Sequence, residues 1–345
     1  MLLSRGGAHF TDDELNEVLS RYDIGKIQRL ESLTAGNRRA PKMVVFSERG
    51  KFLLKRRGSG RDDFYRVAFA HAVHIHLARR DFPVSKLVIT KKDGSTIVQL
   101  DHHIYEMFTF IEGTRYDGSS PAARDAGRKM AGFHGSLEDF KFETMVPLRA
   151  SFHDSGGVRS HLKTIASEKK APIEAMKYTA DALMRLYESA SVKVNALGFD
   201  TWPEIIVHGD WHPGNMLFAE HKVVAMLDFD SVKIAPAVTD LANGMLQFSI
   251  VGGRPDPADW PDYLDMEKLS QFLNGYIEVS PLQQGMLKAL PDLMIETMIA
   301  EAILPVATTG FFGHSKGEDF LKMISRKAKW INDNRRELNE KISPD

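Results

Sequence analysis

The sequence contains no cysteine, which excludes disulfide bonds, thiolate metal sites and catalysis by a thiol. It also lacks an excess of either charge, because 45 basic residues are matched by 46 acidic ones. A chain with this balance has no general affinity for polyanions. We therefore predict no nucleic-acid partner.

Long apolar runs are missing as well. The first ten residues contain no apolar core of signal-peptide length. The most apolar late stretch, residues 293–312, is interrupted by Glu296, Glu301 and Pro305 and is a poor membrane span. We expect a soluble cytoplasmic protein without a membrane partner. No pattern in the sequence indicates an oligomeric state.

The 345 residues are enough for two domains or lobes, each with its own core. Alternation and turn residues predict six strand-like segments, at residues 26–33, 43–46, 52–56, 84–90, 95–100 and 104–111. Helices are predicted over residues 11–22 and 62–79, and Ser59 and Asp62 offer a capping box for the second. From Ser120 onward the pattern is mainly helical, with helices expected at 120–134, 158–166, 172–194, 262–279, 281–305 and 314–341.

The stretch HGDWHPGNMLFAEHKVVAMLDFD, residues 208–230, contains a predicted hairpin of strands 216–218 and 223–227. Asn215 precedes the first strand and Asp228 follows the second, so antiparallel pairing brings both to the same end of the hairpin. An amide oxygen and a carboxylate suit Mg²⁺, which usually keeps phosphate oxygens among its other ligands. Asp210 lies just upstream, so the spacing predicts a phosphoryl-transfer site.

HGDWHPGN followed by LDFD resembles the aminoglycoside phosphotransferase and choline kinase-like family. Protein kinases usually have Arg and Lys where this chain has Gly209 and His212. The resemblance implies an α+β, two-lobed protein kinase-like fold. Residues 1–110 would form a nucleotide-binding lobe with a five-stranded antiparallel sheet, and residues 111–345 a mainly helical lobe with the catalytic loop and the acceptor pocket.

The resemblance also implies roles around the loop. Asp210 would orient the acceptor hydroxyl and accept its proton, while His208 would fix the loop. Metal contacts would come from Asn215, Asp228 and Asp230. Asp240, in a matching D-L-A element, and His212 would support the loop.

On the nucleotide side, the resemblance makes Lys55 the residue that contacts the α- and β-phosphates. The turn at Gly36 and Asn37 would cover the phosphates, although an ordinary hairpin turn explains this turn equally well. Adenine would pair with the backbone of Thr109 and Ile111.

One departure from the family pattern concerns the helix after Lys55, because residues 61–79 contain no glutamate to pair with that lysine. A shorter carboxylate, a histidine or water could replace it, or the pair could be absent.

These features predict an enzyme that transfers the γ-phosphoryl group of ATP, with Mg²⁺, to a hydroxyl of a small molecule. Aminoglycosides, choline, homoserine and sugars are all possible acceptors. The sequence leaves three alternatives open: a protein Ser/Thr kinase, a degenerate kinase that binds nucleotide as an interaction module, and a zinc hydrolase. The last would use His208, Asp210 and His212, which alternate along the chain.

Overall fold

The computed structural model describes residues 9–33, 40–58, 60–142, 150–167 and 173–342. An N-terminal lobe contains one mixed set of strands and helices: α1 (Asp12–Ser20), β1 (Ile27–Leu33), β2 (Lys42–Ser47), β3 (Gly50–Arg56), α2 (Phe64–Ala78), β4 (Val98–Leu100) and β5 (His103–Thr109). The strands form one antiparallel sheet in the order β1-β2-β3-β5-β4. This is the five-stranded sheet that the resemblance implied.

Alternation along the strands separates the two faces of this sheet. Leu54 and Met107 are fully buried in a cluster that includes Leu15 and Val18 of α1. The neighbouring positions point to the opposite face, and the register of β3 and β5 pairs Lys55 with Glu106. A lysine and a glutamate therefore lie together on the face turned away from α1.

Two local predictions in this lobe are wrong. Residues 84–90 do not form a strand but make isolated bridges, among them Val84 with Met226 and Leu87 with Phe108. Val84 bridges to a strand of the C-terminal lobe and Leu87 to β5 of the sheet, so the segment does not pair continuously with one partner strand. Helix α2 is capped by Asp63, which accepts from the Arg66 N–H, whereas Asp62 accepts from Gly60; Ser59 lies outside the described residues.

The C-terminal lobe is mainly helical, as predicted. Its helices are α3 (Ser120–Ser136), α4 (Gly156–Ser167), α5 (Ile173–Ala196), α6 (Ala237–Ser249), α7 (Met266–Ile277), α8 (Gln284–Thr309), α9 (Gly317–Asp333) and α10 (Arg335–Ile342). Its short strands are β6 (Glu204–Val207), β7 (Met216–Ala219), β8 (Lys222–Met226), β9 (Lys233–Pro236), β10 (Phe311–Phe312) and β11 (Ser315–Lys316). Helix α8 continues past Pro305, where the sequence predicted its end.

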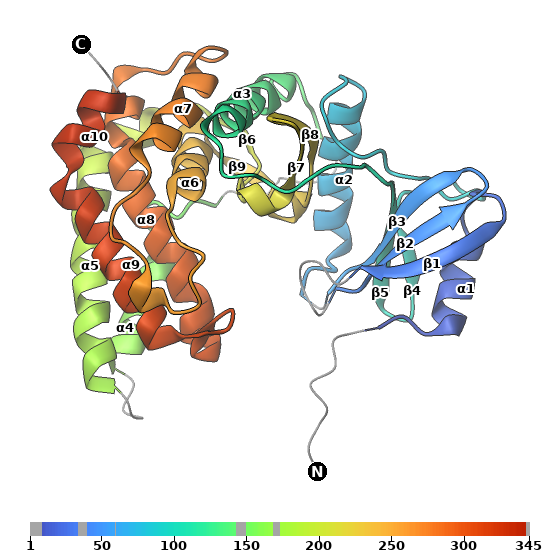
Figure 1. Ribbon diagram of the computed structural model, residues 1–345, viewed down its shortest axis with the longest axis horizontal. Helices are drawn as coiled ribbons and strands as arrows, with labels where there is room; N and C mark the ends of the chain where they lie inside the picture. The colour runs from blue at the N-terminus through green and yellow to red at the C-terminus, as the bar shows by residue number, and fades with distance from the viewer. Residues whose placement is uncertain (1–8, 34–39, 59, 143–149, 168–172, 343–345) are drawn as a thin grey trace.

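Figure 1 shows the sheet and α1 at one end of the molecule and helices α4, α5, α8, α9 and α10 at the other. The pairs β6–β9 and β7–β8 lie between them with α3, so the predicted catalytic segment is central. Helices α3 and α7 cross closely: a Cβ on Gly127 would come within 1.9 Å of the Phe272 carbonyl oxygen. The two-lobed α+β prediction is confirmed.

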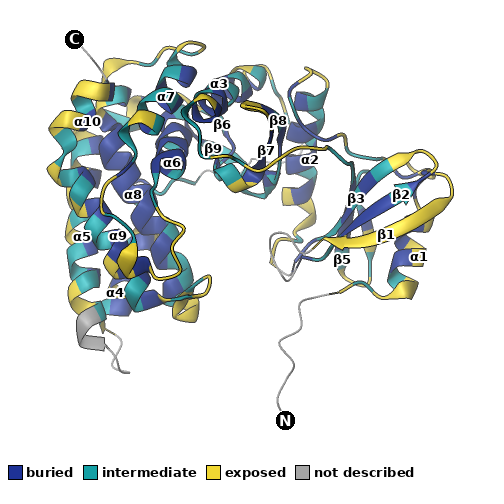
Figure 2. Ribbon diagram, in the orientation of Figure 1, coloured by how far each residue is buried: buried dark blue, intermediate teal, exposed yellow. Residues whose placement is uncertain are grey.

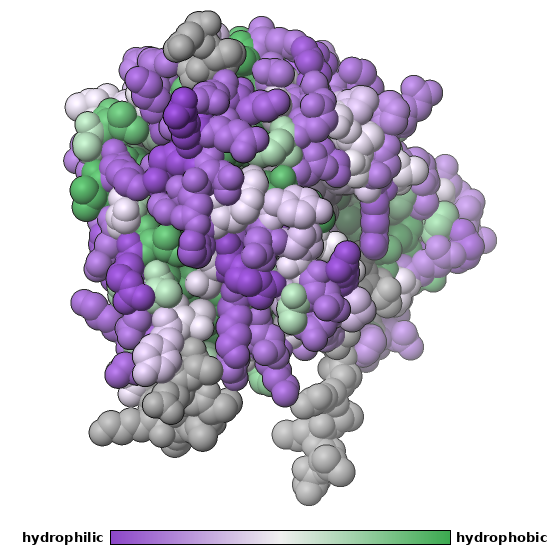
Figure 3. Space-filling model, turned by 60° about the vertical axis from the view of Figure 1, so that its left-hand side comes forward, coloured by the Kyte–Doolittle hydropathy of each residue, from purple (hydrophilic) through white to green (hydrophobic). Residues whose placement is uncertain are grey.

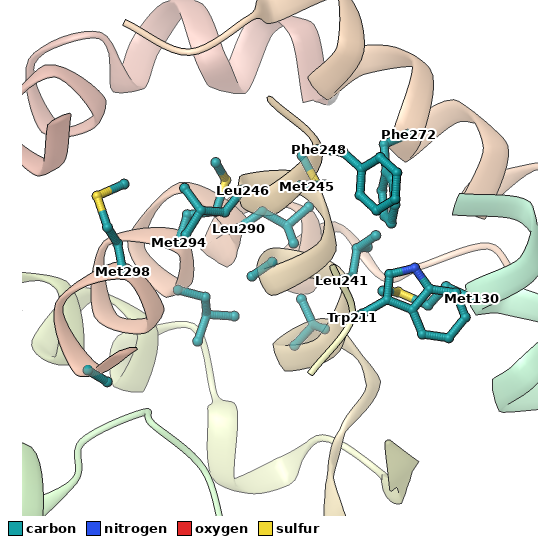
Figure 4. Packing of buried hydrophobic residues seen from close by; sticks show 14 of the residues in the cluster. Met130, Trp211, Leu241, Met245, Leu246, Phe248, Phe272, Leu290, Met294 and Met298 are labelled. Carbon is teal, nitrogen blue, oxygen red and sulfur yellow. The ribbon is translucent and has the colours of Figure 1, made fainter. Parts of the chain in front are cut away.

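The core of the C-terminal lobe fixes the catalytic segment from behind. Trp211 is fully buried and lies beside Met130 and Leu241 in Figure 4, while Met294 and Met298 extend the same cluster along α8. Figure 2 shows that α6 and α8 are buried over most of their length, whereas β1 is exposed. The loop thus rests on the buried core of the C-terminal lobe.

The face drawn in Figure 3 is mainly hydrophilic, with apolar side chains in scattered patches. Among the described residues, none of the helices combines the length and the apolar character needed to cross a membrane.

Candidate active site

The catalytic loop connects β6 to β7, and helix α6 holds its start. The Asp240 carboxylate accepts hydrogen bonds from the backbone N–H groups of His208 (2.8 Å) and Gly209 (2.9 Å). Burial would raise the pKa of Asp240, but the contact with His134 and the loop N–H groups lower it overall. Gly209 has φ +74°, and a Cβ there would lie 2.5 Å from the Ser231 carbonyl oxygen, so only glycine fits this turn.

Asp210 and Asn215 face each other across the loop. The Asn215 Nδ2 donates to both the carbonyl oxygen and Oδ2 of Asp210, each at 3.0 Å. His212 lies on the other side, with its Nε2 3.6 Å from Asp210 Oδ1. Burial opposes ionisation of Asp210, yet the contact with His212 lowers its pKa overall, so the carboxylate is charged at neutral pH.

Asn215 and Asp228 meet at one end of the β7–β8 hairpin. The Leu227 N–H donates to the Asn215 carbonyl oxygen at 2.9 Å, directly before Asp228. Asp228 has φ +58°, and its buried Oδ1 has no hydrogen-bond partner in the described part of the chain. Because Asn215 turns its amide nitrogen toward Asp210, its Oδ1 also remains available. A carboxylate oxygen and an amide oxygen that accept no hydrogen bond from the described residues fit Mg²⁺.

Lys55 reaches across from the N-terminal lobe to this end of the hairpin. Its Nζ lies 3.3 Å from Glu106 Oε1, 3.5 Å from Asp230 Oδ2 and 3.7 Å from Asp228 Oδ1. Burial alone would lower the pKa of Lys55, but these three carboxylates raise it overall. The lysine is therefore charged and bridges the two lobes.

Glu106 is a site residue that the sequence did not reveal. It is 0 % exposed and takes the place expected for a helix glutamate, since it contacts Lys55 from β5. Arg57 binds the same carboxylate through Nε (3.2 Å) and Nη2 (3.1 Å). Helix α2 contributes His71, whose Nε2 lies 2.7 Å from Glu106. A lone glutamate inside the apolar stretch IYEMFTFI is the pattern that could have indicated it.

Asp230 is surrounded by basic side chains. Its Oδ1 lies 2.7 Å from Arg57 Nη2, its Oδ2 lies 3.5 Å from Lys55, and Arg61 is 3.8 Å away. Its side chain is only 8 % exposed. These contacts belong to an ion-pair network between the lobes.

The remaining nucleotide-side predictions fall at the end of β5 and in the first turn of the sheet. The Thr109 N–H donates to the Lys86 carbonyl oxygen at 2.8 Å, so this N–H is already used within the protein. The main-chain groups of Ile111 have no hydrogen-bond partner among the described residues. Gly36 and Asn37 lie outside the described residues.

On the far side of Asp210, two charged residues have no ion-pair partner within the described parts of the chain. Glu301 of α8 accepts from Asn243 Nδ2 (3.0 Å) and Gln247 Nε2 (2.7 Å). Burial, with the charge of Asp210, raises its pKa to about 7. Lys233 of β9 lies with its Nζ 4.8 Å from the ring centroid of Phe152, and burial lowers its pKa.

The zinc alternative required the side chains of His208, Asp210 and His212 to share one side. His208 is instead 0 % exposed, and its ring packs against the aromatic rings of Phe133 and Trp211. No group of three metal-ligating side chains forms anywhere in the described ranges. The arrangement therefore does not support a hydrolytic zinc site.

Comparison with known proteins agrees with this geometry. A model of the phosphotransferase enzyme family matches residues 33–276. The homoserine kinase of Rhodospirillum rubrum is 24% identical over 288 residues, which cover 82% of this chain and 81% of that protein.

Two solved structures are similar at a TM-score of 0.69. One is an amicoumacin kinase in complex with AMP-PNP, Ca²⁺ and Ami. It is 15% identical to this chain, and the alignment covers 94% of each chain. The other is a microcompartment-associated aminopropanol kinase, 14% identical, with 95% of this chain and 98% of that one covered. At these identities the likeness establishes the kinase-like fold.

The matched region begins in β1 and ends in α7, so it contains Lys55, the predicted catalytic loop and the predicted metal-binding end of the hairpin. The family match and the similar small-molecule kinases confirm the prediction of a phosphotransferase with a small-molecule acceptor. They do not favour a protein kinase or a non-enzymatic module. The chain belongs to the phosphotransferase enzyme family.

Proposed function

We propose that this enzyme transfers the γ-phosphoryl group of ATP to a hydroxyl of a small amino alcohol. One observation carries the proposal: the Asn215 amide nitrogen donates to Asp210, while the Asn215 carbonyl oxygen accepts from Leu227, the residue directly before Asp228. A base for the hydroxyl and two oxygen ligands for a metal are thereby joined in one rigid unit. Homoserine and aminopropanol, named for two of the similar kinases, are the first acceptors to consider.

Phosphoryl transfer depends on alignment and on neutralisation of charge. Asp210 accepts the hydroxyl proton as the oxygen approaches the γ-phosphorus. Lys55 contacts the phosphates, and His208 and Asp240 keep the loop in place behind the reacting groups. His212 stabilises the charged form of Asp210.

Asn215 and Asp228 would hold Mg²⁺, and Asp230 would support them through its contacts with Lys55 and Arg57. When bound, the ion neutralises charge on the phosphate oxygens. The backbone near Ile111 and the turn at Gly36 and Asn37 are the proposed adenine and phosphate contacts. A cytoplasmic location stays a prediction.

A panel of hydroxyl compounds tests the function through ADP release. Homoserine, 3-amino-1-propanol, choline, a sugar and an aminoglycoside are each supplied with ATP and Mg²⁺. We expect turnover with at least one amino alcohol. ADP release with none of these acceptors would contradict the proposed function.

Replacing the proposed base tests its role. Asp210→Asn should fold and bind ATP but lose about 10³-fold in kcat, the scale of a general base. The exposed Asp200→Asn change serves as the matched control and should leave kcat unchanged. Near-normal turnover by Asp210→Asn would remove the assignment of Asp210.

A further inference from the structure

Glu301 and Lys233 are not used by phosphoryl transfer as described, although both lie beside the catalytic loop. Glu301 is linked to the loop through helix α6. Asp240, Asn243 and Gln247 are three and seven residues apart, so they share one face of that helix. Asp240 holds the loop, and the other two hold Glu301.

Lys233 reaches the loop from β9. Its backbone pairs with Val207, the last residue before the loop. Its Cε would be only 3.1 Å from a Cβ on Gly209, so the side chain lies against the residue that precedes Asp210. Within the described residues, Lys233 makes a cation–π contact with Phe152 but no hydrogen bond or ion pair.

Asn243 connects the two charges. Its Nδ2 donates to Glu301, while its Oδ1 is buried and has no hydrogen-bond partner in the described ranges. The residue is 4 % exposed and lines, with Lys233 and Gly209, a cavity of about 20 Å³. A space of this size admits one water-sized polar group. An unsatisfied amide oxygen beside such a space indicates a missing hydrogen-bond donor.

The two charges are close enough to the loop to act on a bound acceptor, yet they do not form a salt bridge with each other. Among the described residues, the Glu301 carboxylate accepts from neutral amides and Lys233 packs on an aromatic face. His212 acts on Glu301 only at longer range, as Asp240, Asp210 and Glu301 itself do on Lys233. Burial disfavours both charged forms, as the raised pKa of Glu301 and the lowered pKa of Lys233 indicate. A ligand with one positive and one negative group would stabilise both.

We propose that Glu301 and Lys233 select an acceptor that carries both an ammonium and a carboxylate group, a hydroxylated amino acid. The ammonium group binds Glu301 and donates to the free Oδ1 of Asn243, and the carboxylate binds Lys233. This inference rests on the proposed function. In the transfer step the hydroxyl oxygen bonds to the γ-phosphorus, the bond to the β-phosphate oxygen breaks, ADP leaves, and the hydroxyl proton passes to Asp210.

Other acceptor classes fit the two charges less well. A neutral sugar would leave both without a counter-ion. A quaternary ammonium such as choline has no N–H to donate to Glu301 and Asn243. A charged amino alcohol without a carboxylate would satisfy Glu301 but leave Lys233 unpaired.

Three acceptors that differ only in charged groups test the inference: homoserine, 3-amino-1-propanol, which lacks the carboxylate, and 4-hydroxybutanoate, which lacks the ammonium group. Wild-type protein should show kcat/KM about 100-fold higher for homoserine than for either analogue, the scale of a hydrogen bond to a charged group. Equal values for homoserine and one analogue would overturn the proposal.

Two variants assign each charge to its residue. Glu301→Gln should lose about 100-fold with homoserine and 3-amino-1-propanol but little with 4-hydroxybutanoate. Lys233→Met should show the reverse pattern between the two analogues. The exposed Glu337→Gln and Lys288→Met changes are the matched controls.

The outcomes separate the inference from the proposed function. Equal losses with all three acceptors would mean that Glu301 and Lys233 are only structural and would overturn the inference, while ADP release with homoserine would keep the proposed function. Protein that binds ATP but releases no ADP with any hydroxyl compound would contradict both. The wild-type comparison keeps the inference testable even where a variant does not fold.

Discussion

Glu106 and Glu301 are two glutamates on opposite sides of the predicted catalytic loop, the first fully buried and the second partly buried. Glu106 lies on the nucleotide side and contacts Lys55, Arg57 and His71. Glu301 lies on the proposed acceptor side, and among the described residues its carboxylate accepts from the amides of Asn243 and Gln247 of α6. Burial raises the pKa of both, but the cations around Glu106 reverse this and lower its pKa overall, whereas the pKa of Glu301 rises to about 7.

The difference indicates which charged groups of the site have ion-pair partners before a ligand binds. On the nucleotide side, each buried carboxylate has a basic partner, so the network joins the two lobes before any substrate binds. On the proposed acceptor side, the direct contacts of Glu301 and Lys233 among the described residues are with neutral groups, so pairing with a charged substrate would stabilise both. Perturbed, unpaired ionisable groups of this kind are typical of binding sites.

Asp228 borders both regions, and its removal should have the largest effect. We expect Asp228→Ala to lower kcat about 10³-fold with every acceptor, because one of the two proposed metal ligands is lost. ADP release at saturating ATP and acceptor measures this, with Asp200→Ala as the control. A loss confined to one acceptor would mean that Asp228 serves the acceptor side and would break the comparison.

Glu106 tests whether the nucleotide-side network stabilises the fold. Glu106→Gln should lower the free energy of unfolding by about 3 kcal/mol, because Lys55 and Arg57 would remain buried with one partner fewer. Denaturant unfolding of the nucleotide-free protein measures this loss.

The control for Glu106 is Glu112→Gln. It removes an exposed ion pair with Lys51 and should cost less than about 1 kcal/mol. Equal stability of the Glu106→Gln variant and the wild type would show that desolvation cancels the ion pairs on the nucleotide side.

The catalytic hairpin could be predicted because its geometry is local. Strands β7 and β8 are joined by Glu220 and His221, so alternation and turn residues were enough to bring Asn215 beside Asp228. The capping box of α1, formed by Thr11 and Glu14, is likewise local, because its two residues are three apart. Interactions between residues that are close in the chain can therefore be predicted from a single sequence.

Glu106, Glu301 and Lys233 could not be assigned because their partners are distant in sequence. The contact of Glu106 with Lys55 depends on the register of β5 against β3, and that of Glu301 with Asn243 depends on how α8 packs on α6. The same limit explains residues 84–90, whose alternation suggested a strand although they contact both lobes. The lobe boundary at residues 110 and 111 stays a prediction.

The smallest expected effect is a pH dependence that separates the two glutamates. The pKa of Glu301 is about 7 in the folded protein and near 4.5 when unfolded, so the folded state binds the proton more tightly. Stability from this group is therefore greatest below pH 4.5 and is lost as the pH rises through 7. Glu301→Gln has no such titration, so the variant should gain up to about 2 kcal/mol relative to wild type between pH 5 and 8.

Urea unfolding of the ligand-free proteins at several pH values measures this difference. Asp210, His212 and Lys233 also face Glu301 and remain in both proteins, so the difference between the curves reports the titration of Glu301 together with its coupling to these groups. For Glu106 the sign is opposite, because its lowered pKa makes its stabilisation complete above pH 4.5 and lost only in acid. Parallel stability curves for wild type and Glu301→Gln would mean that Glu301 already has a counter-charge, and the acceptor side would then resemble the nucleotide side.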